Sequence, residues 1–336
     1  MEDQQQQHPP PKPLTSIKLR GQTKKRLAAR LLQIHLRGRP ASVPTTTTTD
    51  TTTAEYKPVR VVCVADTHNT QPVLPAGDVL IHAGDLSDRG SFAEVQAGLS
   101  WLAAQPHQHK ILVAGNHDVL LDDAFLEKHP ERRYGQSATE TRRDLDWGDV
   151  TYLQDRHVTI RVGARSLTIY GSPWTPAYGV SAFQYRPDCP THWSERLRAF
   201  SPAQPPDILV THGPPKLHRD QRDFYRAGCA YLAEQVARLR PRLCVFGHIH
   251  AAYGREDVLV DAVRWQHDTV AIGWAGWAGV VWMLMLVVWA KTTAMLAAPL
   301  RIMGIRHDEK VTTFVNAAVV GGPDNKLRNP PIVVEI

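Results

Sequence analysis

The chain has 336 residues, of which 43% are hydrophobic and 21% charged, so it is long and apolar enough to bury a sizeable core. Lys and Arg outnumber Asp and Glu by 39 to 33. This basic balance suits an anionic partner without choosing between nucleic acid, an acidic membrane and a phosphate-bearing substrate. The four cysteines lack paired spacing, which argues against a disulfide framework, and the N-terminus lacks the layout of a secretory signal. We therefore expect an intracellular, cytoplasmic protein.

Residues 1–55 are expected to form a disordered, basic arm outside the folded domain. Runs of Gln, Pro and Thr in this arm are of low complexity and cannot build a core. Between these runs, residues 18–39 are basic and carry leucines at roughly helical spacing. Two interpretations of this stretch stay open, namely a helix for a membrane surface or for targeting, and a solvated basic arm.

Short apolar runs rich in Val, Ile and Leu begin at Val59. They are Val59–Val64, Val79–His82, Ile111–Ala114, Ile208–Val210 and Leu243–Phe246. Such runs are typical of strands that are buried on both faces. Helical patterns lie between several of them, at Phe92–Ala103, Ala124–Lys128 and Ala230–Leu239. This alternation predicts an α/β layered fold.

Four more strands are predicted, two in the middle of the chain and two near its end. Val158–Val162 and Leu167–Tyr170 flank a short turn that contains Gly163, which predicts a β-hairpin. Thr312–Val320 and Ile332–Ile336 are expected to close the fold.

Polar side chains follow five of the apolar runs directly. They are Asp66 and His68, then Asp85, then Asn116 and His117, then His212, and finally His248 and His250. Because the carboxyl ends of strands in open α/β sheets meet at one edge, these loops can assemble a single site. Carboxylate, imidazole and amide groups bind hard or borderline divalent ions, and two such ions can clamp a displacement at phosphorus. Glycines before Asp85, Asn116 and His248 allow sharp turns and close backbone approach.

The order D-x-H, G-D, G-N-H-D, H-G and G-H-x-H resembles the calcineurin-like metallophosphoesterase superfamily, from Val59 to His250 and again in the closing strands. Three further motifs resemble a subgroup of single-domain metallophosphoesterase-domain proteins, here of a fungal type with a hydrophobic insertion. They are G-S-P-W at Gly171–Trp174, H-G-P-P at His212–Pro215 and F-V-N-A at Phe314–Ala317. The resemblance implies a four-layer α/β/β/α fold, a β-sandwich flanked by helices.

The resemblance also implies a set of metal ligands and catalytic residues. The first metal ion would take Asp66, His68, Asp85 and His250. The second would take Asp85, Asn116, His212 and His248, so that Asp85 bridges the two. His117 would protonate the leaving group, a role suited to imidazole near neutral pH. Asp88 would orient His117, and Arg89 would grip phosphate oxygens with its guanidinium.

The implied activity is hydrolysis of a phosphodiester or phosphomonoester by a hydroxide that two divalent ions activate. Mn, Fe, Zn and Mg all occur with such ligands, so the identity of the ions stays open. One alternative is a membrane-associated scaffold that uses this fold for binding only, although every ligand position is filled. A nucleic-acid-binding role ranks last, because no recognised motif accompanies the basic arm. The oligomeric state stays open.

A hydrophobic insertion at about 262–310 interrupts the domain expected at residues 56–336. Within it, Val270–Ala290 holds 21 residues without a charge and four tryptophans. A single crossing of a membrane would strand Thr312–Val320 on the far side. We therefore consider a membrane surface contacted through residues 270–305, packing against protein or a second subunit, and a true span as the alternatives.

Overall fold

The computed structural model describes residues 17–37, 57–134, 140–296, 310–322 and 324–336. The chain forms two compact units. The described residues of the larger unit are 57–260 and 310–336, with the gaps given above. The smaller unit combines residues 17–37 with residues 261–296, which lie far apart in the sequence.

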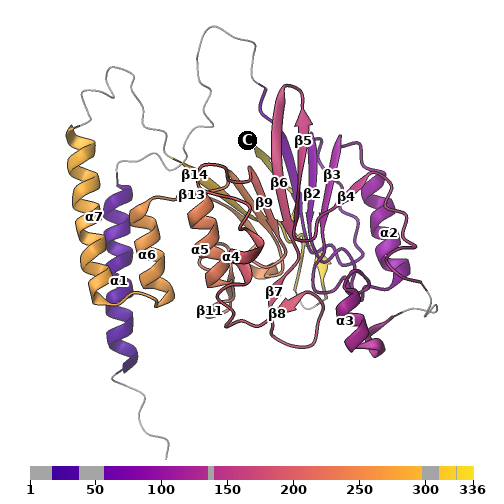
Figure 1. Ribbon diagram of the computed structural model, residues 1–336, viewed down its shortest axis with the longest axis horizontal. Helices are drawn as coiled ribbons and strands as arrows, with labels where there is room; N and C mark the ends of the chain where they lie inside the picture. Colours follow the sequence, from indigo (N-terminus) through magenta and orange to yellow (C-terminus); the bar gives the residue numbers. More distant parts are fainter. Residues whose placement is uncertain (1–16, 38–56, 135–139, 297–309, 323) are drawn as a thin grey trace, which may run out of the picture. The chain divides into compact units, whose positions relative to one another are not determined.

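Two β-sheets build the larger unit (Figure 1). The first has the order β17-β1-β2-β3-β4, in which β1 to β4 are parallel and β17 is antiparallel to β1. Its strands are β1 (Arg60–Val64), β2 (Val79–Ala83), β3 (His109–Val113), β4 (Val150–Tyr152) and β17 (Ile332–Glu335). The central strands are buried along almost their whole length, which explains their continuous apolar runs.

The second sheet has the order β13-β14-β12-β9-β6-β5. Its strands are β5 (Arg156–Val162), β6 (Arg165–Ser172), β9 (Ile208–Thr211), β12 (Leu243–Phe246), β13 (Gly254–Leu259) and β14 (Val311–Asn316). Strands β6, β9, β12 and β14 are parallel, and an antiparallel strand closes each edge. The predicted hairpin is confirmed by β5 and β6, which pair antiparallel across the turn between Val162 and Arg165.

The main core lies between the two sheets. Buried side chains that fill it include Cys63, Ile81 and Val113 from the first sheet and Ile169, Val210 and Val245 from the second. Helices α2 (Phe92–Ala103) and α3 (Asp123–Lys128) add a second apolar cluster on the outer face of the first sheet. Helices α4 (His192–Arg196) and α5 (Ala230–Leu239) do the same for the second sheet. The predicted four-layer α/β/β/α arrangement is confirmed.

Short elements complete the larger unit. They are the paired strands β7 (Thr175–Pro176) with β8 (Gln184–Tyr185), β10 (Gln221–Arg222) with β11 (Tyr225–Arg226), and β15 (Val320–Gly321) with β16 (Lys326–Leu327), and the 3-10 turns Val119–Leu121, Pro130–Arg132 and His250–Ala252.

Helix α2 has the bounds that the sequence predicts. Its start is fixed by a capped first turn. The hydroxyl of Ser91 accepts a hydrogen bond from the Glu94 amide, and the Glu94 carboxylate accepts one from the Ser91 amide. This reciprocal capping satisfies two amides that a helix start leaves without partners.

The smaller unit is a bundle of three helices, α1 (Ile17–Leu36), α6 (Ala262–Ile272) and α7 (Trp277–Leu296). Its buried apolar residues are Ala28, Leu31 and Leu32 of α1, Val263 and Val270 of α6, and Val280, Met283 and Val287 of α7. At one end, Nε2 of the buried His35 lies 2.6 Å from Asp261 Oδ2, and Asp261 also caps α6 by accepting from the Arg264 amide.

Two features of this bundle differ from the expectations drawn from sequence. Residues 17–36 of the expected disordered arm are helical, because their leucine stripe packs on the insertion. The rest of residues 1–55 lies outside the described chain. The uncharged run Val270–Ala290 is split between two helices, because Gly273 ends α6 in the left-handed conformation (φ 103°). Within the described residues, α7 is the one helix long and apolar enough to cross a membrane, by length and composition.

Candidate metal centre

The polar residues that follow the buried strands meet at one edge of the larger unit. The first sheet delivers Asp66 and His68 after β1, Asp85 after β2, and Asn116 and His117 after β3. The second sheet delivers His212 after β9 and His248 and His250 after β12. Because both sets come from the carboxyl ends of parallel strands, the two sheets present their ligands to the same edge.

Three groups of these side chains are close enough to hold a metal ion. The groups are Asp66 with His68 and His250, His68 with Asp85 and His117, and Asp85 with His212 and His248. In each group the ligand atoms lie within 4.8 Å of one another. Asn116 belongs to the same cluster, since its Oδ1 lies 3.0 Å from Nε2 of His212. The structure therefore brings all seven expected ligands together, along with His117.

The Asp85 carboxylate lies at the centre of this cluster. Its Oδ2 is 3.3 Å from Nε2 of His212 and 3.7 Å from Nε2 of His68. Its Oδ1 accepts a hydrogen bond of 2.9 Å from the backbone amide of His117. Asp66 has an equivalent place on the other side, where its Oδ1 lies 3.2 Å from Nε2 of His250. Each carboxylate thus serves imidazoles from more than one loop.

The donor set fits a divalent ion. Both ring nitrogens of His68 are buried and have no hydrogen-bond partner among the described residues, although such groups are normally paired. A metal ion would use one of these lone pairs. His212 is oriented for the same purpose, because its Nδ1 donates to the Ala83 carbonyl at 3.0 Å and its Nε2 is directed at Asp85 and Asn116.

The pKa values show a buried, negatively charged site that its imidazoles compensate. Burial raises the pKa of Asp85, but the charge and hydrogen bond of His212, together with the charges of His117 and His68, hold that pKa well below its ordinary value. Burial lowers the pKa of His212, yet the Asp85 carboxylate raises it to about 9. The pKa of His248 falls to about 3, chiefly because it is buried, so this imidazole is neutral and carries a free lone pair. Burial lowers the pKa of His117, but the charges of Asp85 and Asp118 and the hydrogen bond to the Asp88 carbonyl together raise it above its ordinary value.

The backbone at the site is held in an uncommon conformation. Asp66, His68, Asp85 and His248 all have positive φ, between 42° and 67°, in the left-handed region. Residues other than glycine rarely adopt this region, and each instance costs of order 1–3 kcal/mol. Surrounding contacts therefore hold these loops in place, such as the two oxygens of Asp66 that accept from the His248 amide at 2.9 Å.

The glycines of the motifs make room for the ligands. A Cβ on Gly115 would lie 2.1 Å from Oδ1 of Asp85, and one on Gly247 would lie 2.0 Å from Oδ2 of Asp66. Gly84 has φ 98°, and a Cβ there would lie 2.4 Å from Nδ1 of His212. No side chain fits at these three positions, so the ligand loops require glycine there.

The structure corrects the arrangement expected for Asp88. The Nδ1 of His117 donates to the backbone carbonyl of Asp88 at 2.6 Å, and the Asp88 carboxylate lies 3.6 Å from Nδ1 of His68 instead. The backbone carbonyl of Asp88, not its side chain, is thus the partner of the His117 imidazole. Asp88 therefore orients His117 through its backbone.

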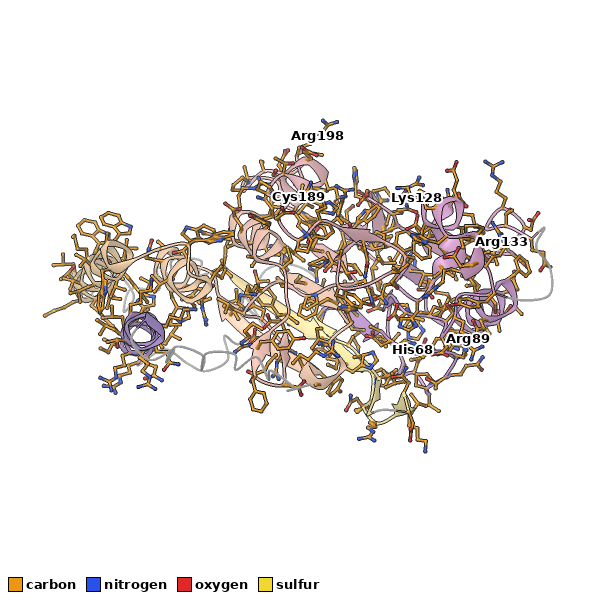
Figure 2. All side chains as sticks on the ribbon, turned by 90° about the horizontal axis from the view of Figure 1, so that it is seen from below. His68, Arg89, Lys128, Arg133, Cys189 and Arg198 are labelled. Atoms are coloured by element: carbon orange, nitrogen blue, oxygen red, sulfur yellow. The ribbon has the colours of Figure 1, made fainter. Side chains whose placement is uncertain are left out.

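Arg89 also differs from its expected place. Its side chain is exposed on the surface near His68 (Figure 2), and its amide donates to Glu94 at the start of α2. The cleft beside the ligands has a volume of about 550 Å³. It is lined by the ligands His68, Asp85, Asn116, His248 and His250, by His117 and Tyr178, and by residues of two distant loops that include Arg222, Asp223, Asn325, Arg328 and Asn329. Among the described residues, Arg222 and Arg328 are thus the guanidinium groups of this cleft, and Arg89 does not line it.

The G-N-H-D motif contains a further supporting residue, Asp118, for which the sequence predicted no role. Asp118 is fully buried and accepts hydrogen bonds from the amides of Leu86, Ser87 and Gly115 and from the Ser87 hydroxyl. It ties the loop after β2 to the loop after β3. Its position directly after the G-N-H triplet was the signal that could have identified it.

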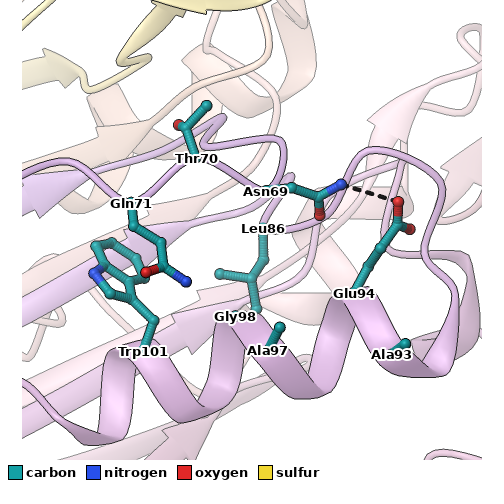
Figure 3. Close-up of a pocket in the computed structure, with 9 residues that line it drawn as sticks. All are labelled: Asn69, Thr70, Gln71, Leu86, Ala93, Glu94, Ala97, Gly98 and Trp101. Carbon is teal, nitrogen blue, oxygen red and sulfur yellow. Dashed lines mark hydrogen bonds between the residues drawn. The ribbon is translucent and has the colours of Figure 1, made fainter.

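A second, more apolar hollow is lined by residues 69–71, by Leu86 and by residues of helix α2 (Figure 3). Its volume is about 330 Å³, and its lining includes Leu86, Gly98 and Trp101. A hydrogen bond of 2.9 Å from Asn69 to Glu94 crosses its rim. None of the metal-ligand candidates lines it, so the chemistry belongs to the cleft.

Comparison with known proteins agrees with the fold and the site. The profile of the calcineurin-like phosphoesterase family matches residues 59–252, which contain all seven ligand candidates. The chain therefore belongs to the calcineurin-like phosphoesterase family.

Three relatives illustrate the similarity. The human metallophosphoesterase domain-containing protein 1 is 37% identical over 209 residues, which are 58% of this chain and 61% of that protein. A UPF0046 protein of Caenorhabditis elegans is 36% identical over 217 residues, 61% of this chain and 73% of the relative. A protein of Emericella nidulans named "Probable rhamnogalacturonate lyase C" is 38% identical over 281 residues, 83% of this chain but 24% of that protein. This chain spans about a quarter of the length of the last protein.

Substitution of Gly115 by alanine should weaken metal binding, because the new Cβ would collide with Oδ1 of Asp85. We expect affinity for Mn²⁺, measured by calorimetric titration of metal-free protein, to fall at least about 10- to 100-fold, as it does when groups that support ligands are changed. Gly179→Ala is the matched control, because nothing lies within 4 Å of its Cβ position. Equal affinity in the two variants would show that the Asp85 position does not determine binding.

Proposed function

We propose that this chain hydrolyses phosphate esters, either phosphodiesters or phosphomonoesters, with two divalent metal ions bound at the cluster around Asp85. The observation that carries the proposal is the convergence of seven N and O ligand groups at one edge of the larger unit, with both ring nitrogens of His68 buried and without a hydrogen-bond partner among the described residues. One ion would be held by Asp66, His68, Asp85 and His250. The other would be held by Asp85, Asn116, His212 and His248. Bound there, the ions would supply Lewis-acid activation and neutralise phosphate charge.

In this proposal, His117 acts as the general acid. Its Nδ1–H donates to the Asp88 carbonyl, so the ring is fixed and Nε2 is the nitrogen left for the cleft that His117 lines. In the reaction, a water oxygen bonds to phosphorus while that water gives up a proton to the solvent, and the bond from phosphorus to the leaving oxygen breaks. His117 transfers its proton to that departing oxygen, which would otherwise leave as an unstable alkoxide.

The walls of the cleft suit an anionic substrate. Arg222 and Arg328 come from separate loops and both line the cleft beside the ligands. A guanidinium binds phosphate oxygens with two parallel hydrogen bonds, so these residues can hold the non-reacting oxygens. Tyr178 places its ring 5.2 Å from that of His248 and offers an apolar surface to the alcohol part of the ester.

The first experiment measures hydrolysis of an aryl phosphodiester and an aryl phosphomonoester by metal-stripped protein, with Mn²⁺ restored or withheld. We expect turnover only with metal, and a loss of at least about 100-fold in Asp85→Asn, because a ligand matters more than the groups behind it. The ratio of the two substrates then defines the class of ester. Folded protein without turnover in any divalent ion would replace hydrolysis by a role in binding only.

The general acid has its own signature. In His117→Gln, kcat should fall by about 10²–10⁴ for an alkyl ester, whose leaving oxygen needs a proton. The loss should be much smaller for a nitrophenyl ester, because nitrophenolate is stable without protonation. His157→Gln, at an exposed histidine on β5, serves as the control. Equal losses for both leaving groups would assign His117 another role.

The cleft arginines can be separated from Arg89 by substrate affinity. In Arg222→Ala, KM should rise by about tenfold with little change in kcat, because a charge-assisted hydrogen bond to the substrate is lost. Arg89→Ala should leave both constants unchanged, since that side chain does not line the cleft. The reverse result would return the phosphate contact to Arg89.

A further inference from the structure

Helix α7 exposes most of its apolar surface. It has twenty residues, of which Lys291 is the one charged residue, and only Val280, Met283 and Val287 are buried. Nine large apolar side chains are about half exposed or more, namely Trp277, Val281, Trp282, Leu284, Met285, Val288, Trp289, Met295 and Leu296. Many are spaced three or four residues apart, so they are neighbours on the helix surface. A monomeric soluble protein rarely exposes such a continuous apolar patch, which marks an interaction surface.

The composition of this surface favours a bilayer as the partner. Trp277, Trp282 and Trp289 are 51%, 53% and 70% exposed. Tryptophan concentrates at the level of lipid headgroups, where its ring is apolar and its N–H stays near water. The smaller unit therefore carries three such anchors on one helix.

The strand pairing shows how α7 can meet a bilayer. Strand β13 ends at Leu259, which pairs with Val311 at the start of β14, so the chain leaves and re-enters the sheet at adjacent positions. Twenty helical residues span about 30 Å, enough to cross the hydrocarbon core once. A return crossing would need about 20 further residues in a helix. Helix α6 has 11 residues and 14 lie between Leu296 and Val311, so a second crossing does not fit.

Helix α1 adds a cationic side to the same bundle. It holds six Lys and Arg residues and no Asp or Glu. Lys25, Arg26 and Arg30 are exposed, while Ala28, Leu31 and Leu32 pack on the other two helices. Helix α7 has no polar face of its own, so the bundle as a whole is amphipathic. Exposed cations on one helix of the bundle and an exposed apolar surface on another suit a leaflet with anionic headgroups.

We propose that the smaller unit binds the surface of an anionic lipid bilayer, with α7 lying in the interface and the basic residues of α1 contacting headgroups, and that it does not span the membrane. The proposal is independent of the phosphoesterase chemistry, because it uses residues outside the cleft.

Co-sedimentation of the full chain with lipid vesicles tests this proposal. We expect tight binding to vesicles of phosphatidylcholine with phosphatidylserine, weaker binding to phosphatidylcholine alone, and release from the former by high salt. The double variant Trp282→Ser/Trp289→Ser should lower the partition coefficient by about 100-fold or more, since burial of each large apolar side chain contributes about tenfold or more. Phe224→Ser, at a fully exposed ring of the larger unit, is the matched control and should bind like the parent.

A charge variant separates the two parts of the surface. Lys25→Glu/Arg26→Glu should weaken binding to the anionic vesicles and leave binding to phosphatidylcholine nearly unchanged. Circular dichroism and metal-induced thermal stabilisation check that each variant is folded. Absence of vesicle binding, with concentration-dependent dimerisation in sedimentation that the tryptophan variant abolishes, would assign the face to a second copy of the chain. Protein that stays with vesicles after an alkaline carbonate wash would overturn the surface arrangement in favour of a span.

Discussion

The Asp85 carboxylate is the group on which the architecture depends. It follows β2, a central strand of the first sheet, and is almost fully buried. A buried carboxylate is costly unless charges and hydrogen bonds compensate it. The first sheet alone supplies His68 and the amide of His117, whereas His212 comes from the second sheet. The buried charge of Asp85 is therefore compensated by groups from both sheets. This requires the carboxyl ends of the parallel strands in the two sheets to lie at the same edge of the larger unit.

The same requirement explains the conformational cost at the site. The positive φ of the ligand residues lowers the stability of the folded state, and burial of the core between the sheets offsets this cost. Gly84, Gly115 and Gly247 have no side chain because the ligand atoms of neighbouring loops occupy that space. Asp118 then fixes two of these loops to each other with four hydrogen bonds, so the ligands are held in place by contacts of the protein itself.

The sequence predicted those parts of the fold whose signals are local. Strands β1, β2, β9 and β12 are buried on both faces, so each is a continuous apolar run, and the ligands follow directly after them. Arg222 and Arg328 could not be predicted, because they reach the cleft from distant loops that lack periodicity or motif. The role of the Asp88 carbonyl was also hidden, since a motif specifies side chains and not which backbone group a turn presents. The helical bundle could not be predicted because α1 packs against α6 and α7, which follow it in the sequence only after most of the larger unit.

The long sequence separation between α1 and the other two helices of the bundle affects how the chain folds during synthesis on the ribosome. His35 and Asp261, which join α1 to α6, are 226 residues apart. At about 5–20 residues per second, α1 emerges roughly 10–45 s before the helices that cover Ala28, Leu31 and Leu32. During that interval an uncovered leucine stripe flanked by lysine and arginine is the kind of segment that nascent-chain chaperones bind. Strands β14 and β17 of the larger unit are made later still, so neither unit can become fully native until the end of the chain has been translated.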